Sequence, residues 1–122
     1  MRFLFWKALI GLLAFDILGR DFGRMLSFVR HWKVLPGRAD PGAVDRVCDA
    51  VNLACSWYPK RARCLQRSAV TTCLLRNYGL AAQMVLGAQR APFKAHAWVE
   101  VEGRVVNDKS YTAEMFAVLD RC

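Results

Sequence analysis

The segment that most restricts the fold of this chain is "AHAWVEVEGRVVND", at residues 95–108, in which apolar and polar residues alternate before a glycine. Such alternation is typical of a half-buried strand, and a glycine between two strand-like runs predicts an antiparallel hairpin. His96, Trp98 and Glu100 would share one face of the first strand. The small apolar residues between them would share the other face and pack on helices.

The position of the turn decides which residues of the hairpin face one another. A two-residue turn at Glu102 and Gly103 lacks the glycine-first, Asn-Gly or Asp-Gly sequences that such turns favour. A three-residue loop of residues 101–103 instead puts Gly103 at the left-handed position that such a loop requires. We therefore predict the three-residue loop.

Two pairs of residues of complementary charge face each other in this register. Glu100 lies opposite Arg104, and His96 lies opposite Asp108, whose carboxylate would select one tautomer of the imidazole and favour its protonated form. A register that differed by one residue would put His96 and Asp108 on opposite faces of the sheet. A lone histidine in a strand usually has a structural role, so this pair does not by itself establish a site.

The remainder of the chain is mainly helical by its apolar periodicity. Helices are predicted from the start of the chain to about Arg20, over residues 21–32, from the Asp40-Pro41 start signal to about residue 57, and from Arg63 to Gly79. A strand ending near Gly87 follows the last of these. These elements predict one α+β domain over residues 1–122, with an amino-terminal helical segment at 1–35 and a core at 40–122.

Two of the segments lead to more specific expectations. Val44, Cys48, Val51 and Cys55 form one apolar stripe of the third helix, which would make both cysteines small core residues. The tail from residue 109 predicts a short terminal helix, and the residues expected to face the domain are Met115, Phe116 and Leu119.

The apolar amino-terminal segment is not a membrane span, because Lys7 and Asp16 interrupt it. It can dock on the core of its own domain, or less favourably on a partner or a membrane surface, and we do not expect membrane association.

The formal charge of +8 favours an acidic partner. Nucleic acid is not expected, because the one tight basic cluster, Lys60, Arg61 and Arg63, has no aromatic residues alternating with it.

The five cysteines are not spaced as the ligands of a structural zinc site, and no secretory cleavage signal precedes them. We therefore expect a reducing cytoplasm, no disulfide framework and neither metal nor cofactor. Cys73 is predicted to be a core residue in the middle of its helix. Cys64 differs from the others, because it begins that helix after basic residues and the positive end of the helix dipole favours its thiolate.

Nucleophilic catalysis by cysteine needs a thiolate, an imidazole beside it and a group that orients the imidazole. Cys64, His96 and Asp108 are the candidates for these three roles in this order. Backbone amides at the start of the Cys64 helix are natural donors to an oxyanion. Trp98 shares the face of His96 and could wall the site, bind a peptide or be structural.

The runs "RCLQRSAVTTCLLRNYGLAAQMVLGAQ" and "FKAHAWVEVEGRVVND", from about Arg63 to Asp108, resemble a known family. They are similar to the transglutaminase-like cysteine peptidases of lasso-peptide biosynthesis, specifically the stand-alone leader peptidase of the split B-protein type. The resemblance implies a papain-like or transglutaminase-like core in which the helix of the nucleophile packs on an antiparallel sheet. It places the nucleophile on Cys64, the general base and acid on His96 and the orienting carboxylate on Asp108.

The resemblance also implies a task, which is to cleave a ribosomally made precursor peptide between its leader and its core. The implied partners are this precursor, a small separate leader-recognition protein and possibly an ATP-dependent macrolactam cyclase that acts afterwards. Two alternatives stay open at this point. The same residues could transfer an acyl group to an amine, or the chain could be a non-catalytic peptide-binding module in which Cys64 is merely buried.

Overall fold

The computed structural model describes residues 2–18, 22–36, 42–57, 64–89, 94–108 and 112–122. The predicted helix start at Asp40 and Pro41 and the basic cluster of Lys60, Arg61 and Arg63 lie outside these ranges.

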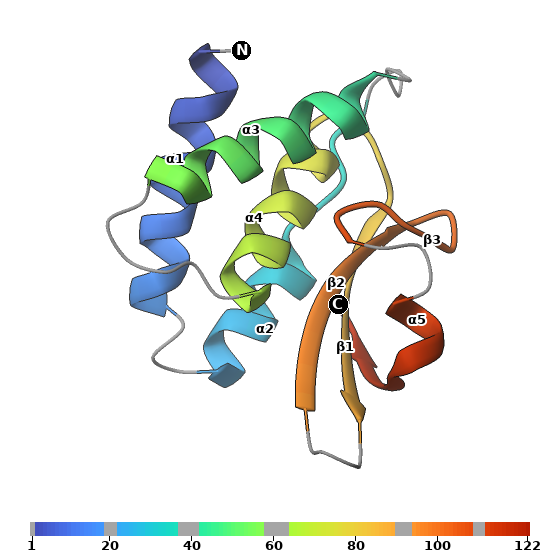
Figure 1. Ribbon diagram of the computed structural model, residues 1–122. Helices are drawn as coiled ribbons and strands as arrows, with labels where there is room; N and C mark the ends of the chain where they lie inside the picture. Colours follow the sequence, from blue (N-terminus) through green and yellow to red (C-terminus); the bar gives the residue numbers. More distant parts are fainter. Residues whose placement is uncertain (1, 19–21, 37–41, 58–63, 90–93, 109–111) are drawn as a thin grey trace.

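A group of helices covers one face of a small sheet (Figure 1). The helices are α1 (Arg2–Leu18), α2 (Phe22–His31), α3 (Ala43–Trp57) and α4 (Cys64–Asn77). The strands are β1 (Ala82–Gln89), β2 (Lys94–Val101), β3 (Arg104–Val105) and β4 (Ala117–Arg121), in the order β3-β2-β1-β4 with every neighbouring pair antiparallel. The one-turn helix α5 (Thr112–Met115) lies on the opposite side of the sheet (Figure 1). The predicted α+β fold is thereby confirmed.

Helix α4 is the centre of this arrangement, because it packs on α1 and α3 and also on β1 and β2. Every residue from Ser68 to Arg76 is buried, which leaves its first turn as its accessible end. Gly79 has a φ of 82° just beyond the last turn and ends the helix in the left-handed conformation that glycine adopts most easily. The two ends of α4 are therefore clearly defined.

Helix α1 buries one face and exposes another that is equally apolar. Its core-facing residues are Leu4, Ala8, Leu12 and Phe15. The exposed apolar residues are spaced by three and four positions, namely Phe3, Trp6, Ile10, Leu13 and Ile17. Among the described helices none is long and apolar enough to cross a membrane. Docking on the domain's own core is thus observed for one face of the segment.

The apolar stripe predicted for α3 is displaced by about one residue. The most deeply buried side chains are Ala43, Val47, Ala50, Val51 and Ala54, so small residues let α3 approach α1 and α4 closely. Cys48 and Cys55 lie at the border of the core and are only half-buried. The helix prediction was right, but the face assigned to it was not the innermost one.

The two faces of β2 differ as predicted from the alternation. Ala97, Val99 and Val101 are buried, and α4 packs on their strand; Val99 and Val101 belong to the main hydrophobic core. Trp98 and Glu100 are buried on the opposite face. Both faces of this strand are therefore covered, although its sequence alternates like that of a half-exposed strand.

The predicted register of the hairpin is wrong by one residue. Val101 pairs with Arg104 and Glu100 with Val105, so the turn consists of Glu102 and Gly103 alone. Their φ angles are 53° and 78°, which are the left-handed values of a primed two-residue turn. The physical reason is the burial of Val101, which is 9% exposed and belongs to the core, so it is held in the strand and not in a loop.

The predicted terminal helix is also wrong beyond its first turn. After Met115 the chain becomes extended, and β4 pairs with β1 along the edge that β2 leaves free. Met115 and Leu119 are exposed, and of the three residues expected to face the domain Phe116 alone does so. The free edge of β1 supplies backbone partners that a single helical turn at the end of a chain lacks.

The side chain of Arg76 joins the helices to the sheet. Its guanidinium donates to the carbonyl oxygens of Val29 and Trp32 at the end of α2, to that of Ala82 in β1 and to that of Cys122 after β4. Arg76 is 6% exposed, and burial lowers its pKa. These bonds add a donor to four carbonyl groups, two of which, those of Val29 and Cys122, also accept a backbone N–H.

Replacing Glu102 by asparagine tests the two-residue turn. Asparagine tolerates the left-handed conformation better than glutamate does, and Asn-Gly is a preferred pair for this turn. Glu102→Asn should raise the free energy of unfolding by roughly 0.5–1 kcal/mol, measured by urea denaturation. Glu102→Val, with a branched side chain, should lower it. Equal stability of the two variants would contradict the turn.

Removing the guanidinium of Arg76 should be far more costly. Arg76→Met keeps most of the apolar stem but removes four hydrogen bonds from a charged group to buried carbonyls, so we expect a loss of roughly 3 kcal/mol or more in urea denaturation. Arg104→Met, at an exposed hairpin position, is the matched control and should change stability by about 0.5 kcal/mol or less. Similar losses for the two variants would show that Arg76 has no special role.

Candidate active site

Cys64 is the first residue of α4, as the sequence predicted. It is half-buried, and the side chains one turn further along the helix enter the core. The amide groups of the first turn of an α-helix have no partners within the helix and carry the positive end of its dipole. The sulfur of Cys64 therefore lies where the backbone provides unpaired donors.

His96 and Asp108 are in direct contact. The Nε2 atom of His96 lies 2.5 Å from Oδ2 of Asp108, and the two side chains are 25% and 20% exposed. The contact exists although the hairpin has the register that should separate these residues. Strand β3 ends after Val105, so Asp108 is not a cross-strand neighbour of His96 and reaches it from the loop that follows.

That loop leaves the sheet because the side chain of Asn107 takes the place of a backbone carbonyl in the hydrogen bonds between the strands. The N–H of Val106 donates to the carbonyl of Val99, but the N–H of Val99 donates to Oδ1 of Asn107 and not to the carbonyl of Val106. The carbonyl of Val106 instead accepts the thiol of Cys48, 3.5 Å away. The chain can then turn out of the plane of the sheet, which brings Asp108 to the imidazole.

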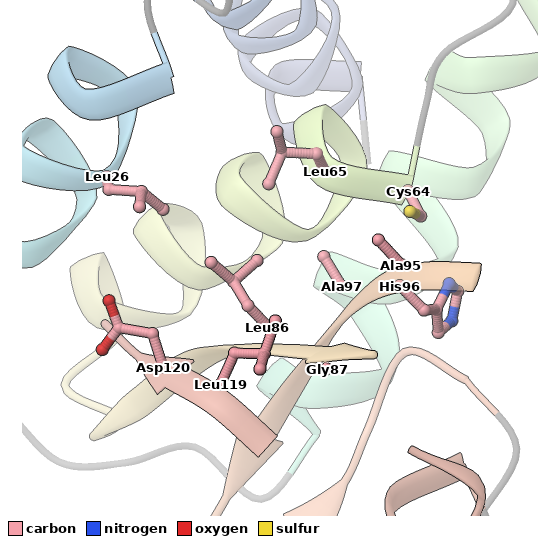
Figure 2. A pocket seen from close by; sticks show the side chains of 10 residues that line it. All are labelled: Leu26, Cys64, Leu65, Leu86, Gly87, Ala95, His96, Ala97, Leu119 and Asp120. Carbon is pink, nitrogen blue, oxygen red and sulfur yellow. The ribbon is translucent and has the colours of Figure 1, made fainter. Parts of the chain in front are cut away.

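Cys64 and His96 line the same pocket, which has a volume of about 460 Å³. Figure 2 shows Cys64 at the start of α4, above the beginning of β2, with Ala95 and His96 beneath it. Leu26 and Asp120 lie at the opposite end (Figure 2). The remaining lining residues are mostly apolar, namely Leu65, Leu86, Gly87, Ala97 and Leu119.

The two nitrogens of His96 have different surroundings. Asp108 holds Nε2, and within the described part of the chain Nδ1 has no hydrogen-bond partner. No hydrogen bond joins the sulfur of Cys64 to this ring among the described residues. Nδ1 is therefore the nitrogen available for proton exchange with a sulfur or a substrate, with Nε2 held by the carboxylate.

Two aromatic rings support the imidazole. The ring of Phe116 lies 5.3 Å from that of His96 at an interplanar angle of 30°, and the ring of Trp98 lies 6.1 Å away at 27°. Trp98 is fully buried, which favours the structural role among those considered for it. Gly87 makes room for this stack, since a Cβ there would lie 2.7 Å from the Trp98 ring and 2.8 Å from Cβ of Phe116.

Comparison with known proteins identifies the family of this chain. A model of the transglutaminase-like superfamily matches residues 9–121. The chain belongs to the transglutaminase-like superfamily. It is also similar to the Microcin J25-processing protein McjB of Escherichia coli, with 32% identity over 59 residues. These are 48% of this chain and 28% of that protein, so the chain spans less than a third of the length of the relative. No solved structure gives a significant match.

In this transglutaminase-like domain, Glu100 is a buried carboxylate on the face of β2 that also carries His96 and Trp98. Glu100 accepts the indole N–H of Trp98 and the guanidinium of Arg121, each at 2.8 Å. Burial alone would raise the pKa of Glu100, but these two hydrogen bonds and the charge of Arg121 outweigh it and hold the pKa below its usual value. The carboxylate thus stabilises the fold above its unfolded pKa, and this contribution is lost as the pH falls through its folded pKa.

Four cysteines of the transglutaminase-like domain, Cys48, Cys55, Cys73 and Cys122, have raised thiol pKa values. All five cysteines are free. Burial, the largest cause in each case, raises the pKa of Cys48 to about 11 and that of Cys73 to about 12, and it also raises the pKa of Cys55 and Cys122. At neutral pH these four groups stay protonated, and protonated thiols are poor nucleophiles.

A methyl group at position 87 should disturb the support of the imidazole. The methyl group of Gly87→Ala would overlap the ring of Trp98 and the Cβ of Phe116, so both must move, and we expect a loss of roughly 1–3 kcal/mol in stability. The NMR shifts of the His96 ring protons, which depend on the two neighbouring rings, should change in the same variant. Gly103→Asn is the control, because a Cβ there meets nothing within 4 Å and asparagine tolerates the positive φ. Unchanged His96 shifts in Gly87→Ala would contradict the stacked arrangement.

Proposed function

We propose that this protein is a cysteine peptidase that removes the leader from a ribosomally synthesised lasso-peptide precursor. The observation that carries the proposal is the pairing of His96 with Asp108 at one end of a pocket that Cys64 also lines. Membership of the transglutaminase-like superfamily supports it, and so does the similarity to a protein named for processing microcin J25.

The proposed reaction begins at the sulfur of Cys64. Its thiolate attacks the carbonyl carbon of the scissile bond, a carbon–sulfur bond forms, and the electron pair of the carbonyl moves to oxygen. Unpaired amides in the first turn of α4 stabilise this oxyanion. The carbon–nitrogen bond then breaks, and the leaving amine takes the proton of His96 Nδ1. The products of this step are a thioester on Cys64 and the released amino terminus of the core peptide.

Hydrolysis of the thioester restores the enzyme. Water attacks the thioester carbon and gives a proton to Nδ1 of His96, and the carbon–sulfur bond breaks to return the thiolate. Asp108 orients the ring through Nε2 in both halves of the reaction, which leaves Nδ1 for the exchange of protons with the reacting atoms. The carboxylate is therefore expected to contribute less than the sulfur or the imidazole.

The pocket beside Cys64 is where we place the precursor. Its walls are formed by leucine side chains from α2, α4, β1 and β4, so a peptide bound here would bury apolar side chains close to the scissile bond. At the far end Asp120 pairs with Arg30, with 2.8 Å between Oδ2 and Nη2, and both side chains are about half exposed.

The partners in this proposal follow from the resemblance to the split B-protein type. They are the precursor, a small leader-recognition protein and, as a third candidate, the ATP-dependent cyclase, and we propose that they meet in the cytoplasm. In this arrangement the recognition protein holds the leader, and the peptidase contributes the reactive cluster. The cyclase would then join the new amino terminus to an acidic side chain.

Two other functions remain as alternatives. Acyl transfer to an amine would use the same thioester, with an amine in place of water, and would yield an isopeptide-linked product. A non-catalytic peptide-binding module would not need a reactive thiol, so Cys64 would be alkylated no faster than the other four cysteines near neutral pH. Both the product and the alkylation rate can be read by mass spectrometry.

Incubation with a candidate precursor and recognition protein tests the proposal directly. The wild-type protein should yield two peptides whose masses add up to the mass of the precursor plus one water. Cys64→Ala and His96→Ala should each reduce the rate by roughly a factor of 1,000 or more, because each removes a reacting group. Asp108→Ala should retain measurable activity, since the carboxylate acts through the imidazole.

Cys55→Ala provides the matched control, because it removes a half-buried thiol from α3 and leaves the pocket unchanged. It should lower stability and keep the cleavage rate within about threefold. Full cleavage by Cys64→Ala would rule out the proposed nucleophile.

A further inference from the structure

We propose that Ser68 and Asn107 are positioning residues for the reaction, acting as a clamp that holds the elements bearing Cys64, His96 and Asp108 in one arrangement. This inference rests on the proposed peptidase function. Neither side chain touches the pocket, and each acts through the backbone of a neighbouring residue.

The clamp is a short chain of hydrogen bonds. The hydroxyl of Ser68 donates to the carbonyl of Ala97 at 3.1 Å and accepts the side-chain amide of Asn107 at 3.2 Å. The Oδ1 atom of Asn107 accepts the N–H of Val99 at 2.8 Å. Both polar atoms of the asparagine side chain are thus engaged, one with α4 and one with β2.

Each contact lies close to one of the three candidate catalytic residues. Ser68 is one helical turn after Cys64, Ala97 follows His96 in β2, and Asn107 immediately precedes Asp108. The distance from α4 to β2 is set at Ser68, and the distance from the loop to β2 is set at Asn107. A second, longer contact runs from Arg67 to the carbonyl of Asn107, 3.4 Å away.

Burial makes the clamp sensitive to the loss of either member. Ser68 is 0% exposed and Val99 is 0% exposed, so water cannot replace a missing partner without opening the packing. If Ser68 loses its hydroxyl, the amide of Asn107 and the carbonyl of Ala97 both lose a partner. The spacing between the helix and the strand then depends on apolar contacts alone, which have no direction.

Small displacements matter to the chemistry, because the sulfur, the imidazole and the substrate must align within a few tenths of an ångström. A misplacement of about 1 Å can lower a rate by roughly a factor of 100 without affecting the chemical groups themselves. Since the clamp does not touch the pocket, its loss should leave the binding of substrate nearly unchanged. It should therefore lower kcat and not raise KM.

The experiment compares Ser68→Ala and Asn107→Ala with the wild-type protein. Steady-state cleavage of the precursor with its recognition protein measures kcat and KM, and the rate of alkylation of Cys64 by iodoacetamide at pH 7 measures the reactivity of the sulfur without substrate. Thr72→Val is the control, because the hydroxyl of Thr72 is equally buried in α4 but bonds only to the carbonyl of Ser68 within the helix. Asn107→Ala, at a half-buried loop position, provides the result if Ser68→Ala does not fold.

We expect kcat and the alkylation rate of Cys64 to fall together by roughly 10- to 100-fold in both clamp variants, with KM within about threefold of the wild type. Thr72→Val should keep both rates within about twofold. A folded Asn107→Ala with the wild-type kcat and alkylation rate would overturn the clamp, and so would a loss of the same size in Thr72→Val.

The two proposals fail in different ways. Absence of precursor cleavage, together with the expected fall in Cys64 alkylation, would overturn the proposed function and leave the clamp intact. Wild-type Cys64 that is alkylated no faster than the buried thiols would overturn the clamp as well, because there would be no reactive pair to position.

Discussion

The guanidinium of Arg76 is the contact on which the arrangement of helices and sheet depends. It binds carbonyl groups at the end of α2, at the start of β1 and after β4, so one side chain of α4 contacts all three segments. A charged group is costly to bury, so it is retained in a core only where several acceptors surround it. With the sheet tied to its carboxyl end, α4 can be displaced mainly at its other end, where Cys64 lies roughly 18 Å away at 1.5 Å per residue.

The amino end of α4 is held by a different kind of interaction. The neutral side chains of Ser68 and Asn107 make the shorter contacts there, beside the longer one from Arg67 to the carbonyl of Asn107, and the chain beyond them is the loop that bears Asp108. Salt and pH have little effect on such bonds, whereas Arg76 and Glu100 depend on charge. The candidate site is thus built on a helix that is secured by a buried charged group at one end and mainly by uncharged hydrogen bonds at the other.

Much of the fold could be predicted from local pattern, because the helices and the faces of β2 follow from periodicity. The features that local pattern could not predict depend on tertiary contacts. Val101 belongs to the core, and its burial forces the turn onto Glu102 in a left-handed conformation that the sequence argues against. The open edge of β1 converts the predicted terminal helix into β4, since Met84 and Cys122 exchange both backbone hydrogen bonds. The structural role of Arg76 was not predicted either, because an arginine near the end of a helix is ordinarily a solvated charge.

The contact between His96 and Asp108 was expected for a reason that the structure does not support. Sequence reasoning made them cross-strand partners, but the true register pairs Glu100 with Val105 and, if continued, would put Asp108 on the face opposite His96. The contact survives because Asn107 provides the acceptor that the backbone of Val106 would otherwise have supplied to Val99. The ladder therefore ends without leaving a buried N–H unpaired, and the chain is free to carry the carboxylate around the edge of β2. Residue type and spacing were enough to identify His96 and Asp108. Asn107, which allows them to meet, is a residue type common in loops, and its role is recognised only from the hydrogen bonds of β2.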